Sequence, residues 1–263
     1  MGLHDAIADW LIRYLTGELP GYQRRVPNDL PRMRETMEPC DILLVEGNSR
    51  ISQMIMYLTQ SSWSHAAIYI GDALLRWGGP HAAEALERFG EEATSLLVES
   101  DMLNGVTVRP LSKYQDRNIR ICRPFGLRVD DRDRVLSVVL SHLGVRYDRR
   151  NIFDLARYLT PLHLLPRKFR RRTFYFGSSG SREIICSALL AKAFYKANYP
   201  IQPMIRVANP DAEYPARTRS MARHPSYIMP RDFDLSPNFE VLKLNLTGQV
   251  PHEDMAWGLG AEG

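Results

Sequence analysis

A cysteine and a histidine are the residues of this chain best suited to do chemistry. Cys186 lies near the start of a predicted helix over 182–195, and His65 lies in an alternating segment over 62–71. A thiol is a useful nucleophile only as its thiolate, and a helix N-terminus and a nearby imidazole both lower its pKa. The two residues therefore predict a thiol nucleophile with an imidazole base. The histidine precedes the cysteine, whereas a simple papain arrangement has the reverse order.

Each of the two residues also has a purely structural explanation. A core histidine is commonly held by a backbone carbonyl, and free cysteine is among the most often buried residue types. Strand alternation places His65 on the same face as Ala67 and Tyr69, with Ala66 and Ile68 on the other face. The pair predicts a site only if the fold brings the two side chains together.

A third group is needed to orient the imidazole and to support its charged form. Glu99 is the best candidate, because it closes the apolar run 96–99, a strand that would naturally pair beside the histidine strand. Glu84 and Asp72 are its rivals. Glu183, three residues before the cysteine, is better explained as an acid in the first turn of a helix, where the helix dipole favours negative charge.

The composition is that of an ordinary globular protein. The 263 residues are 44% apolar and 24% charged, and this length permits one large domain or two small ones. The three cysteines are odd in number and widely spaced, which predicts no disulfide framework, and no Cys or His cluster has zinc-site spacing. We therefore expect no metal, no cofactor and a reducing compartment.

The periodicity predicts an α+β fold, with helices packed against a mostly antiparallel sheet. Residues 3–16 are expected to form an amphipathic helix that ends at Gly17, and residues 18–39, which hold four prolines, an irregular connector. The expected strands are 41–46, 64–70, 96–100, 105–109, 118–124, 226–229 and 239–244, and the other expected helices are 51–58, 130–143, 151–165 and 182–195.

The organisation along the chain follows from these elements. Residues 1–37 are the N-terminal helix and its connector, and residues 38–197 are the expected catalytic core. Residues 198–263 are rich in proline, which breaks up long elements, and they are expected to wrap the same domain.

Two segments bear on the location of the protein and on its partners. The longest stretch without Asp, Glu, Lys or Arg, residues 51–71, carries too many polar side chains for a transmembrane helix, and the N-terminus lacks the pattern of a secretory signal. We expect a cytoplasmic protein. Residues 1–16 and the basic cluster 167–172 offer peripheral contact with acidic lipid at the inner membrane. The alternatives are docking of the helix on its own domain and a solvated basic loop, and no nucleic-acid-binding module accompanies the cluster.

Five motifs in sequence resemble one enzyme family. The chain resembles the YiiX/YebB-like (also YaeF-like) permuted papain-fold cysteine hydrolases, a permuted branch of the NlpC superfamily. Two departures are Ala188, where the family often has glutamate, and Cys40, where it has glycine. The matching segments, in the order of the family, are Asp41-Ile42-Leu43, 59–71, Val98-Glu99 with Gly105-Val106, 144–148 and Ile185-Cys186-Ser187.

The resemblance implies a permuted papain-like core in which the histidine strand comes first and the cysteine helix late. It assigns the nucleophile to Cys186, the base to His65 and the orienting group to Glu99. It also places Tyr147 near the pocket, and Trp63 and Ser64, beside the histidine, are expected to bind substrate.

The expected activity is hydrolysis of an amide or peptide bond, as in a cell-wall peptide, through an acyl-enzyme. The expected partner is a peptide or acyl-amide substrate. Two alternatives stay open: a lipid acyltransferase or thioesterase of the lecithin:retinol acyltransferase-like type, and a papain-like module that binds a ligand without catalysis.

Overall fold

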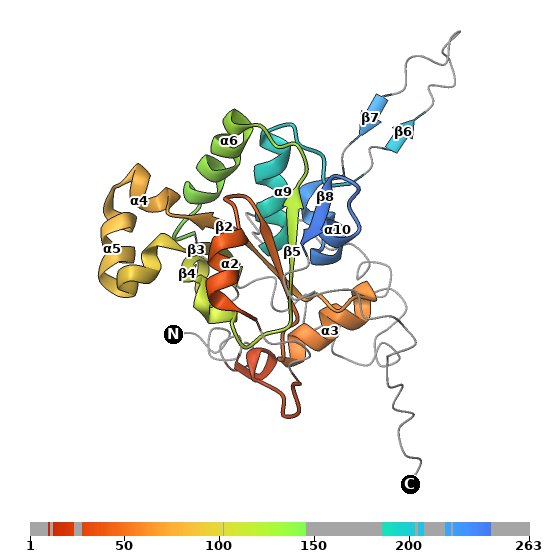
Figure 1. Cartoon of the computed structure of the whole chain (residues 1–263). Helices are drawn as coiled ribbons and strands as arrows, with labels where there is room; N and C mark the ends of the chain where they lie inside the picture. Colours follow the sequence, from red (N-terminus) through yellow and green to blue (C-terminus); the bar gives the residue numbers. More distant parts are fainter. Residues whose placement is uncertain are drawn as a thin grey trace, which may run out of the picture.

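A six-stranded antiparallel sheet lies at the centre of this computed structural model (Figure 1). The structure describes residues 10, 13–23, 28–101, 103–145, 186–202, 205–207, 219–221 and 223–242. The strand order is β4-β3-β2-β1-β5-β8, and every neighbouring pair is antiparallel. The bounds are β1 Ile42–Val45, β2 His65–Gly71, β3 Leu96–Asp101, β4 Gly105–Pro110, β5 Ile119–Pro124 and β8 Phe239–Leu242.

Helices cover both faces of this sheet. The helices are α2 Leu30–Thr36, α3 Arg50–Thr59, α4 Ala73–Trp77, α5 Pro80–Phe89, α6 Val129–Leu140, α9 Cys186–Lys196 and α10 Pro230–Asp234. Short 3-10 turns are η1 Gly90–Thr94, η2 Leu111–Tyr114 and η4 Pro225–Tyr227, and β6 Ile205–Val207 pairs with β7 Arg219–Met221 apart from the main sheet. The predicted α+β class, with an antiparallel sheet against the cysteine helix, is confirmed.

The two faces of β2 enter two different cores. Ala66, Ile68 and Ile70 pack with buried side chains of α6 and α9, and Figure 1 shows these helices lying side by side. Ala67 and Tyr69 pack on the opposite face, against residues of α2 and η2. The predicted alternation is therefore confirmed, and it fixes which face of the sheet carries the His65 side chain.

The predicted strands 41–46, 64–70, 96–100, 105–109, 118–124 and 239–244 and helices 51–58 and 130–143 match β1, β2, β3, β4, β5, β8, α3 and α6 within a few residues. Two assignments were wrong. Within the expected connector 18–39, Leu30–Thr36 is a helix, because Asp29 caps it by accepting a hydrogen bond from the Arg32 N–H at 3.1 Å and proline is tolerated in a first turn.

The second wrong assignment is the expected strand 226–229. Residues 225–227 form the 3-10 turn η4, with His224 as its cap, and Pro230 then opens α10. Two prolines five residues apart fix the backbone in turn and helix-start conformations and remove two N–H donors from any ladder. Helices α4 and α5 had no counterpart in the sequence analysis.

Cys40, the position where the family has glycine, adopts a φ of 80°. This is the left-handed region, which glycine enters without steric cost and other residues rarely adopt. The Cys40 side chain is fully buried next to β1. The departure from the family pattern therefore falls on a residue whose backbone conformation favours glycine.

Several sequence assignments lie wholly or partly outside the described residues. Helix 151–165, the basic cluster 167–172 and residues 182–185 lie entirely outside them. Of the predicted helix 3–16, Trp10 and residues 13–16 are described and helical, and Gly17 donates its N–H to the Arg13 carbonyl at 3.0 Å. Within the described part of the chain, no helix combines the length and the apolar content that crossing a bilayer requires.

Candidate active site

His65 and Glu99 meet because β2 and β3 are adjacent in the sheet. Glu99 lies opposite Ala67 in the β2–β3 register, so its side chain shares a face with His65 two residues away. The His65 Nε2 atom is 3.2 Å from Glu99 Oε2. The Glu99 carboxylate is fully buried, whereas 22% of the His65 side chain is exposed.

Three further donors surround the Glu99 carboxylate. The Arg109 Nε–H donates to Oε1 at 3.2 Å, the Lys113 ammonium also donates to Oε1, and the Tyr114 hydroxyl donates to Oε2. Arg109 belongs to β4, and the other two belong to η2, the turn that follows it. The carboxylate therefore has two cationic neighbours, Arg109 and Lys113, and two other hydrogen-bonding neighbours, His65 and Tyr114. Both of its oxygens are satisfied, so the charge can be buried.

Cys186 is the first residue of α9 that the structure describes, and its side chain lies against the histidine strand. Its sulfur hydrogen-bonds with His65 and accepts from the backbone N–H groups of Ala66 and Ser187. Since Nε2 of the imidazole faces Glu99, Nδ1 is the ring nitrogen left for the sulfur. The structure thus brings together all three residues that the sequence singled out.

The electrostatics of this cluster favour a thiolate–imidazolium pair. Burial alone would raise the pKa of Cys186, but the His65 imidazole and the two backbone donors outweigh it, and the pKa falls below its usual value. Burial opposes charge on His65 as well, yet Cys186 and Glu99 raise its pKa to about 10. Burial alone would raise the pKa of Glu99, but the hydrogen bonds and positive charges of His65 and Lys113 outweigh burial, so the pKa of Glu99 is lowered.

The other two cysteines have the opposite electrostatics. Cys40 and Cys122 are both fully buried. Desolvation raises the pKa of Cys40 and raises the pKa of Cys122 to about 12. A buried thiol of this kind is inert at neutral pH, so the three cysteines are chemically distinct.

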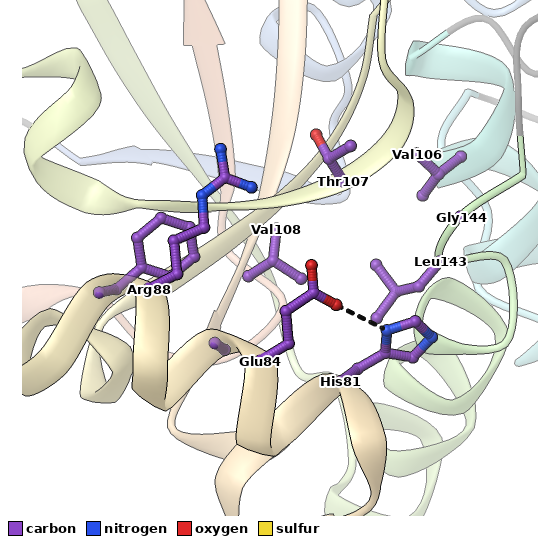
Figure 2. A pocket seen from close by; sticks show the side chains of 10 residues that line it. His81, Glu84, Arg88, Val106, Thr107, Val108, Leu143 and Gly144 are labelled. Carbon is purple, nitrogen blue, oxygen red and sulfur yellow. Dashed lines mark ion pairs between the residues drawn. The ribbon is translucent and has the colours of Figure 1, made fainter.

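The rivals of Glu99 have other partners. Glu84 faces His81 at 3.7 Å across one turn of α5, at the rim of a separate cavity of about 130 Å³ (Figure 2). Asp72 accepts from the Arg76 Nε–H at 2.9 Å. Of these three carboxylates, Glu99 is the one in contact with His65.

The expected substrate-binding residues lie in different places. Trp63 is buried, and its Nε1–H donates to Asp234 Oδ2 at 3.0 Å. Ser64 is buried too, and its Oγ accepts from the Gly47 N–H at 3.0 Å. Both side chains have partners within the protein, and Tyr147 lies outside the described residues. Substrate contact by these residues stays a prediction.

Arg109, Lys113 and Tyr114 are site residues that sequence reasoning missed. A signal existed for Arg109, because a hairpin that pairs Glu99 with Thr107 places residue 109 on the same face. The other two belong to η2, a short turn without any periodic pattern. Their approach to Glu99 depends on how that turn folds back under β3.

The Tyr114 hydroxyl gives a test of the carboxylate cluster. Tyr114 is buried, and burial together with Glu99 raises its pKa, so it donates as a neutral phenol. We expect Tyr114→Phe to lower the free energy of unfolding by about 2 kcal/mol, because a hydrogen bond to a charged group is lost. Urea unfolding measures this, with Tyr57→Phe at a 75% exposed position as the control. Equal losses in both variants would contradict the assignment.

Comparison with solved structures shows a structural likeness. No family model matches the chain, and no curated protein does. Among solved structures, the chain is similar to "Crystal structure of metalloprotein yiiX from Escherichia coli O157:H7, DUF1105", at 15% sequence identity and a TM-score of 0.47. The match covers 78% of this chain and 96% of that chain. This neighbour carries the name of the YiiX-like family that the sequence motifs resemble.

Proposed function

We propose that this chain is a cysteine hydrolase that cleaves an amide or peptide bond through an acyl-enzyme on Cys186. One observation supports this most directly: the Cys186 sulfur interacts with the His65 imidazole and with the backbone N–H groups of Ala66 and Ser187. A thiol in that setting ionises more readily than an ordinary thiol, and its thiolate is a nucleophile.

The reaction follows from these contacts. His65 takes the thiol proton, and the sulfur attacks the carbonyl carbon of the substrate, whose oxygen becomes an oxyanion. His65 then gives its proton to the leaving nitrogen as the C–N bond breaks, which leaves a thioester on Cys186. Water, deprotonated by His65, cleaves the thioester, releases the acid and restores the thiol.

Glu99 has the orienting role in this proposal. Its Oε2 holds the Nε2 side of the ring, which directs Nδ1 toward the sulfur, and its negative charge supports the imidazolium. Arg109 and Lys113 keep the carboxylate ionised. Since the carboxylate is fully buried, this orientation does not depend on solvent.

The neighbour's title calls that protein a metalloprotein, but the described residues here do not fit a metal ion. Both oxygens of Glu99 already accept hydrogen bonds, and Arg109 and Lys113 would place two positive charges beside a bound cation. Among the described residues, no group of three His, Cys, Asp or Glu side chains is arranged to hold a metal. We derive no step through a metal.

Acyl transfer to or from a lipid stays the alternative. It depended on residues 1–16 and 167–172, most of which lie outside the described part of the chain. The described residues therefore support hydrolysis better than lipid acyl transfer.

Alkylation by iodoacetamide tests the proposed nucleophile without a known substrate. At pH 7 we expect Cys186 to react at least tenfold faster than Cys40 or Cys122, because only its pKa is lowered. Because its pKa is lowered, the rate of Cys186 should begin to fall at a lower pH than that of an ordinary thiol, which already loses rate below about pH 8.5. Above about pH 10, His65 loses its proton and the ion pair ends. Peptide mapping by mass spectrometry reads each site.

His65→Ala is the matched variant for this experiment. Removing the imidazole leaves burial as the main influence on the thiol, so we expect the acid limb of the Cys186 profile to move to higher pH. A wild-type profile that already falls below about pH 8.5, or labelling of Cys186 no faster than of the other cysteines, would refute the proposed nucleophile.

A further inference from the structure

A second cavity has a volume of about 560 Å³. It lies between the end of α3, at Leu58 and Thr59, and the segment from Tyr227 to Ser236 that contains α10. Its volume is in the range of pockets that bind small molecules.

Two hydrogen bonds hold the cavity wall to segments that adjoin the candidate active site. The Ser187 hydroxyl, next to Cys186, donates to the Ile228 carbonyl at 2.6 Å, and the residues on either side of Ile228 both line the cavity. The Arg231 guanidinium donates to the carbonyl of Thr59 and so joins the two walls of the cavity, and residues 60–64 lead from Thr59 into His65. The cavity wall is therefore attached to the segments that carry the nucleophile and the base.

Part of the lining is apolar and exposed. Leu58, Tyr227 and Leu235 are 51%, 44% and 64% exposed, although all three face one cavity. Large apolar side chains that stay in contact with water around a hollow are typical of a surface that a ligand covers.

The same cavity carries two arginines that have no ion-pair partner among the described residues. Neither Arg223 nor Arg231 forms an ion pair with a described carboxylate, whereas Arg120 and Arg123, in the nearby strand β5, both do. Asp232 also lines the cavity, but its Oδ2 accepts from the Met229 N–H at 2.7 Å as part of the cap of α10. Two guanidinium groups beside one engaged carboxylate make the described lining of the cavity net positive, and the guanidinium fork matches a carboxylate.

We infer that this cavity binds the leaving part of a short peptide substrate, an apolar residue that ends in a free carboxylate. The apolar side chain would cover Leu58, Tyr227 and Leu235, and the carboxylate would pair with Arg223 and Arg231. This inference rests on the proposed function, because it places the scissile bond at Cys186. It narrows the substrate from any amide to peptides cut near their C-terminus.

Two alkylating peptides test the inference without turnover. Chloroacetyl-Gly-Leu and its C-terminal amide carry the same reactive carbon, and attack by the Cys186 thiolate forms a thioether and expels chloride in both. In the wild-type chain we expect the acid to label Cys186 about tenfold faster than the amide. This ratio corresponds to one additional charge-assisted hydrogen bond between the peptide carboxylate and the cavity. Arg223→Gln should reduce this ratio severalfold. Leu235→Asn should slow both peptides but leave iodoacetamide labelling unchanged.

Arg88→Gln is the matched control, since Arg88 is an exposed arginine at the other cavity (Figure 2). It should leave the acid-to-amide ratio unchanged. Equal rates for acid and amide in the wild type, or an equal loss of the ratio in Arg88→Gln, would overturn the inference. If iodoacetamide labels Cys186 rapidly but the acid and the amide peptide react at equal rates, the cavity does not bind the substrate carboxylate, and the proposed hydrolase is unaffected. Slow labelling of Cys186 by iodoacetamide would reject the hydrolase itself.

Discussion

Cys186→Ala is expected to abolish hydrolysis, with a loss in kcat on the order of 10⁶ for any peptide or acyl-amide that the wild type cleaves. The sulfur is the only group in the cluster that forms a covalent bond to the substrate in the proposed mechanism. His65 and Glu99 would still be in place, but they have no nucleophile to activate. The measurement is a turnover assay on the best substrates from a panel of peptides and acyl-amides.

The fold should survive this change. Alanine has the highest helix propensity, and Cys186 is at the start of α9 rather than in the aromatic cluster around Phe194. The melting temperature should therefore stay within a few degrees of the wild type. Cys122→Ala is the control, because it removes an inert thiol from the core and should cost stability but not activity. Unchanged hydrolysis in Cys186→Ala would end the enzymatic proposal.

Glu99→Gln is expected to lower kcat by roughly 10²- to 10⁴-fold, because the neutral amide can no longer support the imidazolium. The charge of Glu99 helps to raise the pKa of His65 to about 10. Without that charge the pKa of His65 falls, and the weaker imidazolium in turn lets the pKa of Cys186 rise. The pH profile of Cys186 alkylation should then show its acid limb at higher pH than in the wild type.

The same variant should also lower the free energy of unfolding by about 3 kcal/mol. This value is at the lower end of the range for a broken buried ion pair, because Lys113 is 38% exposed and can be solvated when it loses its partner. All four neighbours of Glu99 offer donors, whereas glutamine has one acceptor oxygen and directs its NH₂ group at the others. Glu84→Gln, at a 69% exposed side chain, is the control and should change neither stability nor rate. An active and stable Glu99→Gln would contradict the orienting role.

The positions of the main strands along the chain and the two faces of β2 could be predicted because they depend on local patterns. The alternation around His65 has a period of two residues, and an apolar run that closes at Glu99 is a strand wherever it packs. The amphipathic pattern in 51–58 and 130–143 likewise gave α3 and α6. The prediction of an irregular connector over 18–39 is wrong because proline, which breaks a helix interior, also starts helices such as α2.

The sequence by itself determined which side chains could act as nucleophile, base and orienting acid, since these roles follow from residue type and from strand and helix periodicity. Tertiary contacts were needed to show which carboxylate touches the imidazole, that Arg109, Lys113 and Tyr114 surround that carboxylate, and that the Ser187 hydroxyl joins α9 to the segment that lines a second cavity. These contacts join residues far apart in the chain. They depend on strand register, on how turns fold back and on desolvation, and no local pattern encodes those.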